Sequence, residues 1–484
     1  MNIKKIIFAL GFLAVTFLSS AQEYVSPDAQ SSMIAYNSLN FSQTNPVLGT
    51  ARYSGMAGAM GALGGDATTM RDNPAGLGVY RSSDITITPN FSVANDHSVG
   101  FNINNFGLVL NFRNSGNRTG YVTSSLGITY NRLKNFNRFS DLGGDDLGHS
   151  MVDYIPPHAT DALYDDAYAL GLIDDDGVVF GWNGEDFDAV SNQTRYSENG
   201  SISEWNFAYG LNISNRFYFG FSTAFVNLNY QAKMLYDEAV AINPGDTWYM
   251  DNLYEVNGSG FNFKFGAIAA PADFMRIGVA LHTPTFYNID EFFSEDLSYN
   301  GYFANGEFPR ENSYRSDLQT PLKLQGSLGF IIGKTAIIGL EYQYEDFTAM
   351  RFSSGNVLDQ GSKNLINNEM KITHTAKAGA EVRVVDGLSL RAGFAFVTNP
   401  SIELSPDVYS NPENFLPYPL AQPQNTFYYT GGIGYKGKSF YADLAYVHQV
   451  REESFFQYLP QEEFSPYALK LHNSNITATF GFRF

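Results

Sequence analysis

The chain ends with the stretch Asn475-Ile476-Thr477-Ala478-Thr479-Phe480-Gly481-Phe482-Arg483-Phe484. Apolar and polar residues alternate through it with a period of two, which is the side-chain period of a β-strand. Ile476, Phe480 and Phe484 therefore share one face, opposite Thr477 and Arg483. A strand face with this many apolar side chains must be covered by lipid or by a very large core.

The same alternation recurs from Ser83 onward, and the connections alternate between a few residues and twenty or more. Tight turns on one side and long loops on the other are typical of transmembrane β-barrels with lipid-facing apolar and lumen-facing polar residues. The sequence predicts an all-β membrane protein, a barrel of about fourteen antiparallel strands. The strands are expected at 84–93, 99–113, 120–136, 202–214, 216–231, 255–270, 273–288, 319–332, 334–346, 370–385, 387–398, 426–436, 439–450 and 470–484.

The connections indicate which end of the barrel faces the periplasm. The tight turns carry residues that favour turns and are expected there: Ser214-Asn215, Pro271-Ala272, Gly333-Lys334, Asp386-Gly387 and Gly437-Lys438. The long connections are expected outside the cell, at 137–201, 232–254, 289–318, 347–369, 399–425 and 451–469. The first of them, 137–201, is rich in Asp and Glu, so it is expected to lie in water.

Charged residues within the strands test this assignment. Lys377, Glu381 and Arg383 have one parity, while Ile372 and Val382 have the other. Arg or Lys on the lipid face near the midplane costs about 2 to 4 kcal/mol, so the charges are expected to face the lumen. Soluble sandwiches also alternate, but the N-terminus and the aromatic C-terminus favour a barrel.

The N-terminus indicates export. Lys4 and Lys5 precede an apolar run from Ile6 to Leu18, and Ser19-Ser20-Ala21 provides small residues for cleavage. Residues 1–21 are therefore expected to be a signal peptide, and the bacterial outer membrane is the expected location. The net charge of −19 argues against nucleic acid as a partner, and the absence of cysteine excludes disulfides.

Residues 22–82 do not alternate and contain the small-residue run from Gly55 to Gly65. They are expected to form a compact unit packed against something larger, with the barrel at 83–484. At the end of this segment, Asn73-Pro74-Ala75 stands just before the first strand. This layout and motif resemble the FadL/TodX family of outer-membrane transport proteins for hydrophobic compounds. The resemblance implies that residues 22–82 are a hatch that plugs the barrel.

The resemblance also implies passive, hatch-gated transport of fatty-acid-like or aromatic compounds. No cofactor is expected, and the scattered histidines show no metal-ligand spacing, so no metal is expected. If the substrate carries a carboxylate, the inward cations Arg276, Lys377 and Arg391 are candidate ligands. They are alternatively expected to brace the interior by pairing with carboxylates such as Glu341. The loop aromatics Phe292-Phe293, Phe415, Tyr418 and Phe455-Phe456 are candidates for a capture surface or for interfacial anchors.

Two other functions remain to be weighed. A hydrolase would need Ser and His together on the lipid face, and His374, the candidate histidine, has no serine in register, so no enzymatic activity is expected. An adhesin or structural barrel with a cation-binding acidic loop is the stronger alternative. The expected partners are the bilayer, lipopolysaccharide, a hydrophobic substrate and, through Phe484, the barrel-assembly machinery. The protein is expected to work as a monomer.

Overall fold

The computed structural model describes most of the chain. The described part comprises residues 29–94, 99–114, 119–145, 151, 161–173, 189–240, 247–300, 305–354, 359–402, 419–457 and 466–484. The expected signal peptide, the acidic residues 174–188, and the loop residues Phe415 and Tyr418 lie outside it.

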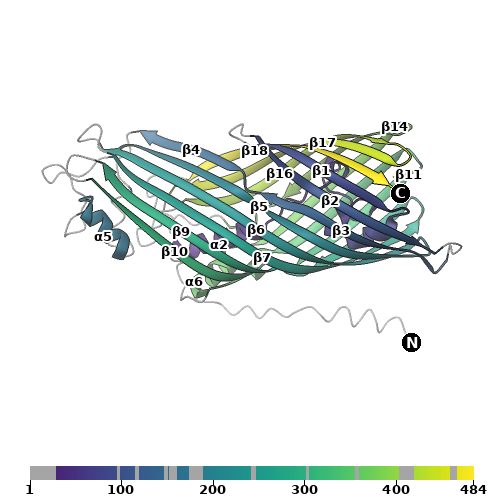
Figure 1. Cartoon of the computed structure of the whole chain (residues 1–484), viewed down its shortest axis with the longest axis horizontal. Helices are drawn as coiled ribbons and strands as arrows, with labels where there is room; N and C mark the ends of the chain where they lie inside the picture. The colour runs from purple at the N-terminus through teal and green to yellow at the C-terminus, as the bar shows by residue number, and fades with distance from the viewer. Residues whose placement is uncertain are drawn as a thin grey trace.

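The strands form one antiparallel sheet, and β1 pairs with both β2 and β18, so the sheet closes into a barrel (Figure 1). The segments are β1 (Asp84–Val93), β2 (Val99–Arg113), β3 (Tyr121–Asn135), β4 (Arg138–Asp145), β5 (Ala189–Ile213), β6 (Phe217–Val240), β7 (Thr247–Ala272), β8 (Met275–His282), β9 (Phe286–Asn300), β10 (Asn305–Gln319), β11 (Lys323–Ile332), β12 (Ala336–Asp346), β13 (Arg351–Ser354), β14 (Ile372–Val385), β15 (Leu388–Val397), β16 (Leu420–Lys436), β17 (Phe440–Phe456) and β18 (Tyr467–Arg483).

Four of the barrel strands are interrupted, so that β3 continues as β4, β8 as β9, β10 as β11, and β12 as β13. Counted in this way, the barrel has fourteen strands, and the predicted fold is confirmed. The turns fall close to the expected places, with Ser214, Asn215 and Gly387 at positive φ. One differs: β7 runs to Ala272, so its turn lies at Asp273-Phe274 rather than at Pro271-Ala272.

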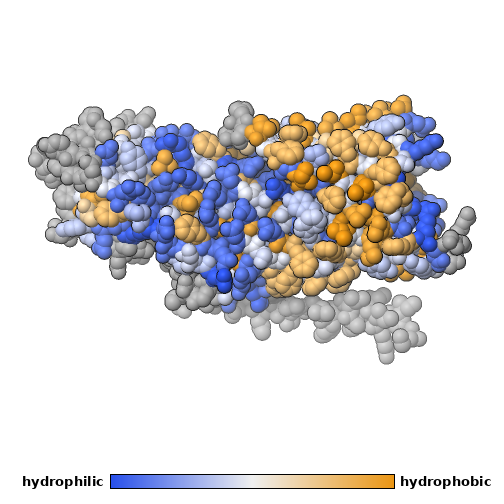
Figure 2. Space-filling view, viewed as in Figure 1, coloured by the Kyte–Doolittle hydropathy of each residue, from blue (hydrophilic) through white to orange (hydrophobic). Residues whose placement is uncertain are grey.

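A belt of exposed apolar side chains surrounds one half of the barrel and identifies the membrane-spanning part. Figure 2 shows the belt in orange at the right, next to the mainly hydrophilic other half. Phe219, Phe265, Leu340 and Phe480 all point outward from it. Outside lipid, such a surface would be a large uncovered apolar patch. No helix in the described residues is long and apolar enough to cross a membrane.

The other half of the barrel is an extension of the strands beyond the belt, and it corrects the loops expected at 137–201, 232–254 and 289–318. β5, β6 and β7 have 25, 24 and 26 residues, more than the roughly ten that span a bilayer. In β6 the outward residues up to Phe225 are aromatic, apart from Thr223, and those that follow are polar, at Asn227 and Asn229. The inward residues become apolar at the same height, beginning with Val226 and Leu228. The face chemistry therefore inverts where the strand leaves the lipid.

The N-terminal residues lie inside the barrel as four short helices. These are α2 (Ala29–Ser42), α3 (Ala51–Gly55), α4 (Thr69–Asp72) and the 3₁₀ helix η1 (Pro74–Val79). Three further helices belong to connections between strands: α5 (Asp161–Ala169), α6 (Asp359–Glu369) and the 3₁₀ helix η4 (Phe347–Ala349). α2 packs against α6, and η1 against β5, β6 and β7, so the described residues before β1 fill the lumen.

Candidate functional site inside the barrel

A row of inward-facing glycines lets the backbone of the N-terminal segment touch the wall. Gly329, Gly339, Gly379 and Gly393 stand directly opposite one another on β11, β12, β14 and β15. A side chain at Gly339 would collide with the carbonyl oxygen of Ala59. Glycine within a strand often marks such a close approach. The run of small residues from Gly55 to Gly65 therefore packs directly against wall positions that have no side chain.

A second glycine row receives the motif that the resemblance singled out. Gly210, Gly220 and Gly266 are directly paired across β5, β6 and β7. A side chain at Gly220 would collide with the backbone of Pro74, and one at Gly266 would collide with the side-chain amide oxygen of Asn73. Asn73 also donates from Nδ2 to the carbonyl of Gly61 at 2.8 Å, and its Oδ1 accepts from the Ala75 amide at 3.1 Å. Asn73-Pro74-Ala75 thus joins the two ends of the segment and seats them on the wall.

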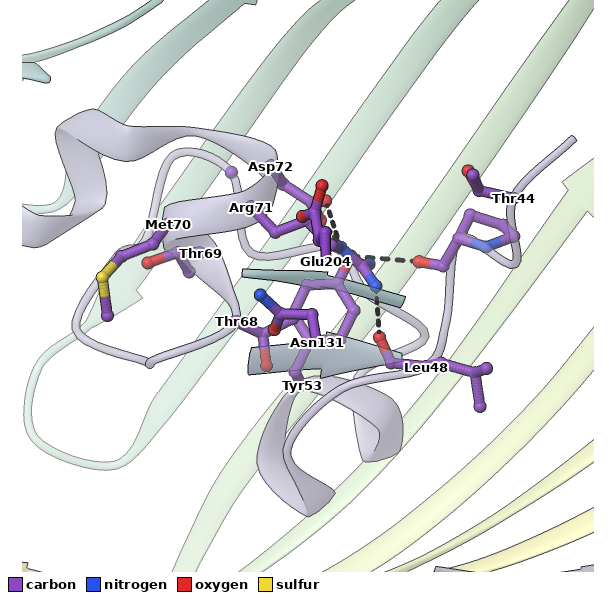
Figure 3. A network of polar contacts seen from close by, with 12 residues as sticks. Thr44, Leu48, Tyr53, Thr68, Thr69, Met70, Arg71, Asp72, Asn131 and Glu204 are labelled. Carbon is purple, nitrogen blue, oxygen red and sulfur yellow. Dashed lines mark hydrogen bonds and ion pairs between the residues drawn. The ribbon is translucent and has the colours of Figure 1, made fainter. Parts of the chain in front are cut away.

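A buried ionic network holds the segment together (Figure 3). Arg71 donates from Nε to Asp72 at 2.9 Å, from Nη1 to the Leu48 carbonyl at 2.9 Å and from Nη2 to the Tyr53 hydroxyl at 3.1 Å. Tyr53 in turn bonds to Asp72. On the wall, His282 contacts the carbonyl oxygen of Asp72 at 2.6 Å. Such a network makes the segment rigid because every member is bonded.

The structure gives each of the three candidate ligand cations a partner in a separate place. Lys377 pairs with Glu341 at 2.8 Å, and Arg391 lies between Glu381 at 2.7 Å and Asp443 at 2.6 Å. Arg276 donates to the carbonyl oxygen of Leu63 at 2.5 Å. All three cations contact the N-terminal segment, either directly or through a carboxylate that they share with it. Arg276 contacts it directly, Glu341 also accepts from the Gly61 amide at 2.9 Å, and Glu381 also pairs with Arg52 at 2.8 Å. These contacts agree with the alternative in which the inward cations pair with groups of the protein and hold the barrel interior together.

Replacing Lys377 by methionine is expected to destabilise the folded barrel by about 3 to 5 kcal/mol. Both members of its ion pair are completely buried, so Glu341 would be left as an uncompensated charge. Urea titration of the protein in detergent micelles measures the change. The control is Lys233→Met, which removes an exposed pair with Asp251 and should cost at most about 1 kcal/mol. Equal effects of the two substitutions would contradict the bracing role.

Above the membrane belt the lumen becomes apolar. The inner faces of the extended strands form one buried cluster with residues of the segment and of α5. Its fully buried members include Ile202, Leu228, Tyr236, Trp248, Met250, Val256, Ile289 and Phe455. We call this region the upper chamber. Leu170, Leu172 and Ile173, which follow α5, also lie in it, so the chain covers the chamber from above.

The carboxylates of the upper chamber are bonded to aromatic side chains. Glu198 accepts from Tyr230 at 2.6 Å and from Tyr196 at 3.2 Å, and Glu238 accepts from Tyr236 at 2.6 Å and from Trp248 at 3.1 Å. Burial and the neighbouring Glu198 raise the pKa of Tyr230 well above its ordinary value. The hydroxyl therefore keeps its proton and donates it to the carboxylate. At one edge of the chamber, Arg138 pairs with Glu198 and Glu453 and lies over the rings of Tyr196 and Phe455, so the charges there are paired and covered by rings.

The cavities of the described lumen are small. One of about 100 Å³ lies beside Lys134, Arg138 and Arg451, and another of about 70 Å³ lies beside Lys264 and His282. Ligand sites commonly measure roughly 300 to 1,000 Å³, so neither holds a sizeable molecule as it stands. At these two places the lumen is closed to a sizeable ligand. No group of three or more His, Asp or Glu side chains in the described residues is placed to bind a metal ion.

The sequence predicted a compact N-terminal segment and inward cations, but it did not predict the upper chamber. Its signal is present in β6, where Leu228, Tyr230, Ala232 and Met234 alternate with polar residues. That is the pattern of a strand with an apolar inner face and a wet outer face, the reverse of a lipid-facing strand. Phe455, expected in a loop, is buried in the chamber, and Phe456 is buried beside α2.

Comparison with known proteins shows likeness in structure rather than in sequence. No family model and no curated protein sequence matches the chain. Among solved structures, a FadL homologue of Pseudomonas aeruginosa has a TM-score of 0.55 at 13% identity, covering 91% of this chain and 99% of its own. The toluene transporter TodX of P. putida has a TM-score of 0.54 at 11% identity, and TbuX of Ralstonia pickettii 0.52 at 15%; each covers the same shares, 91% and 99%.

At these identities the likeness concerns the fold, and it covers 91% of the chain. The structural resemblance stated from Asn73-Pro74-Ala75 and the layout of the chain is confirmed. The protein therefore has the fold of the FadL and TodX channels, a closed barrel of fourteen antiparallel strands.

Proposed function

We propose that this protein is a passive outer-membrane channel for small hydrophobic molecules, which enter through the upper chamber and are gated by the N-terminal segment acting as a hatch. The observation that carries the proposal is the inversion of the inner face above the membrane belt, where Leu228, Val256 and Ile289 line the lumen. A porin with a water-filled channel has a polar interior instead. The fold that this protein shares with the FadL homologue and the toluene transporter TodX also supports the proposed function.

Entry into the chamber needs no energy source. Moving an apolar molecule out of water is favourable by about 25 cal/mol per Å² of buried surface. The chamber is packed with its own side chains, so entry requires them and the residues after α5 to give way. Methionines such as Met234 and Met250 suit this because their flexible side chains repack readily.

The exit is more restricted than the entry. The two glycine rows, the ion pair between Arg52 of the hatch and Glu381, and the hydrogen bond from the Gly61 amide to Glu341 hold the hatch against the wall on several sides. Passage is therefore expected to involve a local rearrangement of the hatch rather than its departure as a body. Phe484, whose amide and carbonyl both bond to Ser83, is proposed to direct assembly in the membrane.

The alternative as an adhesin or structural barrel depends mainly on acidic residues outside the described part, and none of the described contacts favours it. Uptake of ³H-toluene and of a labelled long-chain fatty acid by cells with and without the protein decides between the two. Faster uptake of either compound in the presence of the protein is the expected result. Equal uptake of both would favour the adhesin or structural function.

A further inference from the structure

A serine and two histidines form a hydrogen-bonded chain on the outer surface of the barrel. Ser474 on β18 stands directly opposite His448 on β17, and the serine Oγ lies 3.1 Å from His448 Nδ1. On the other side of the same ring, His448 Nε2 lies 3.3 Å from Nδ1 of His472. The Tyr446 hydroxyl lies 3.0 Å from Ser474 Oγ. We call these four residues the outer-face cluster.

Stacking fixes the rings of the outer-face cluster. The rings of Tyr446 and His448 are 6.4 Å apart and within 12° of parallel, and those of His448 and His472 are 5.4 Å apart and within 26°. All four residues have the parity of outward neighbours such as Leu444 and Ile476, which are exposed. The cluster is thus preorganised on strands rather than on loops, and it faces away from the lumen.

The height of the cluster matches the outer edge of the membrane. Ser474 is ten residues from Phe484. At about 3.3 Å per residue and a tilt of about 40°, this corresponds to about 25 Å, the height of the apolar band of such barrels. Below it lie the exposed apolar side chains of Ile476 and Phe480, and above it Lys470 pairs with Glu452 in an exposed ion pair. Acyl ester bonds of membrane lipids lie at this boundary between hydrocarbon and water.

The hydrogen bonds place a nucleophile, a base and an orienting group in sequence. With its proton on Nε2, His448 donates to His472 and leaves Nδ1 to accept the proton of Ser474. This is the logic of a catalytic triad, which is recognised by geometry and not by order in the chain. Tyr446 adds a hydroxyl donor within reach of an oxyanion formed next to the serine.

We propose that the outer-face cluster hydrolyses acyl esters of lipids in the outer leaflet, an activity separate from transport through the interior. Ser474 Oγ attacks the ester carbonyl carbon while His448 takes the serine proton, and the oxyanion accepts a hydrogen bond from Tyr446. The bond to the lipid alcohol breaks, and His448 protonates that oxygen. Water, deprotonated by His448, then attacks the acyl-serine, which releases the fatty acid and restores Ser474. His472 is a positioning residue.

His374 shows how an ordinary interfacial histidine differs. Its Nδ1 contacts the Tyr342 hydroxyl at 2.6 Å on the same outward surface, and its backbone amide bonds to Thr398. No described serine hydroxyl is hydrogen-bonded to this ring. His374 is therefore the matched control for His448, because both rings lie beside a tyrosine on the barrel exterior.

The test uses the full-length mature protein in vesicles of phosphatidylethanolamine and phosphatidylglycerol with a radiolabelled acyl chain, purified from a host without its own outer-membrane phospholipase. We expect release of labelled fatty acid that falls at least about 10³-fold in Ser474→Ala and His448→Ala, about 10²-fold in Tyr446→Phe, and not at all in His374→Ala. His472→Ala should lower kcat with KM unchanged, and His472→Asn, which restores a hydrogen-bonding group, should recover part of it.

A second measurement is independent of the lipid chosen. A fluorophosphonate probe should label Ser474 in the wild-type protein, as located by mass spectrometry, and should leave the His448→Ala variant unlabelled. Heat-dependent migration on gels confirms that each variant is folded. The absence of labelling at Ser474 in the folded wild-type protein, together with fatty-acid release equal to that of Ser474→Ala, would overturn the proposal.

Discussion

Cells that carry the Leu228→Asp variant are expected to take up toluene and fatty acid no faster than cells without the protein. Leu228 is completely buried in the upper chamber, and it lies beside Gly258 and Ile289 on the neighbouring strands. A carboxylate there makes the entry polar and attracts water. An apolar molecule then loses much of the transfer free energy that draws it in. Uptake of the labelled compounds, normalised to the amount of folded protein in the membrane, measures the effect.

The control lies one residue further along β6. Asn229 faces outward, where its amide donates to Asn257 at 2.8 Å, so Asn229→Asp introduces the same charge on the wet outer surface. Its uptake should equal that of the wild type. If Leu228→Asp is folded and transports as fast as Asn229→Asp, the upper chamber is not on the path of the substrate.

Introducing a side chain into the glycine row is expected to loosen the contact between the hatch and the barrel wall. In Gly339→Val the new atoms would meet the backbone carbonyl of Ala59, which has no rotamer through which to escape. Overpacking of this kind typically costs about 1 to 3 kcal/mol, and the upper end is expected here because the hatch is also held by Glu341. The midpoint of urea unfolding in micelles, and protease sensitivity of the hatch, measure the loss.

Gly326→Val is the matched control for that substitution. Gly326 is on the adjacent β11, and a side chain there meets nothing within 4 Å. Valine suits a strand and should leave stability within about 0.5 kcal/mol of the wild type. A Gly339→Val protein as stable as Gly326→Val, with an equally protected hatch, would show that the segment does not seal against the wall.

The strands themselves were predictable because their signal is local. In the stretch 370–385, the alternation alone indicates which residues face lipid and which face the lumen. Thr373, Thr375 and Lys377 were expected to face the lumen, and the structure buries them. The strand ends beyond the membrane were predicted too short in β5, β6 and β7. The alternation continues past the membrane edge, but the apolar residues move from the outer face to the inner face. A prediction that requires apolar residues on the outer face therefore ends the strand at the membrane edge.

The candidate sites were less predictable because they depend on which strands are neighbours. Asn73-Pro74-Ala75 was recognisable as a motif, whereas its seat on Gly220 and Gly266 required the structure. Inward cations were identified by parity, but parity does not reveal that Lys377 meets Glu341 across a strand pair. The sequence offers no serine in register with His374, whereas the structure places Ser474 beside His448 on another strand pair.

The sequence by itself determined the closed barrel, its strand number and the side of each strand that meets lipid. These follow from a period of two and from turn residues, which act over a few neighbours along the chain. Only the tertiary structure decided the upper chamber, the glycine rows, the ion pairs and the outer-face cluster. Each of these depends on the register between strands, and register is set by the packing of the whole barrel.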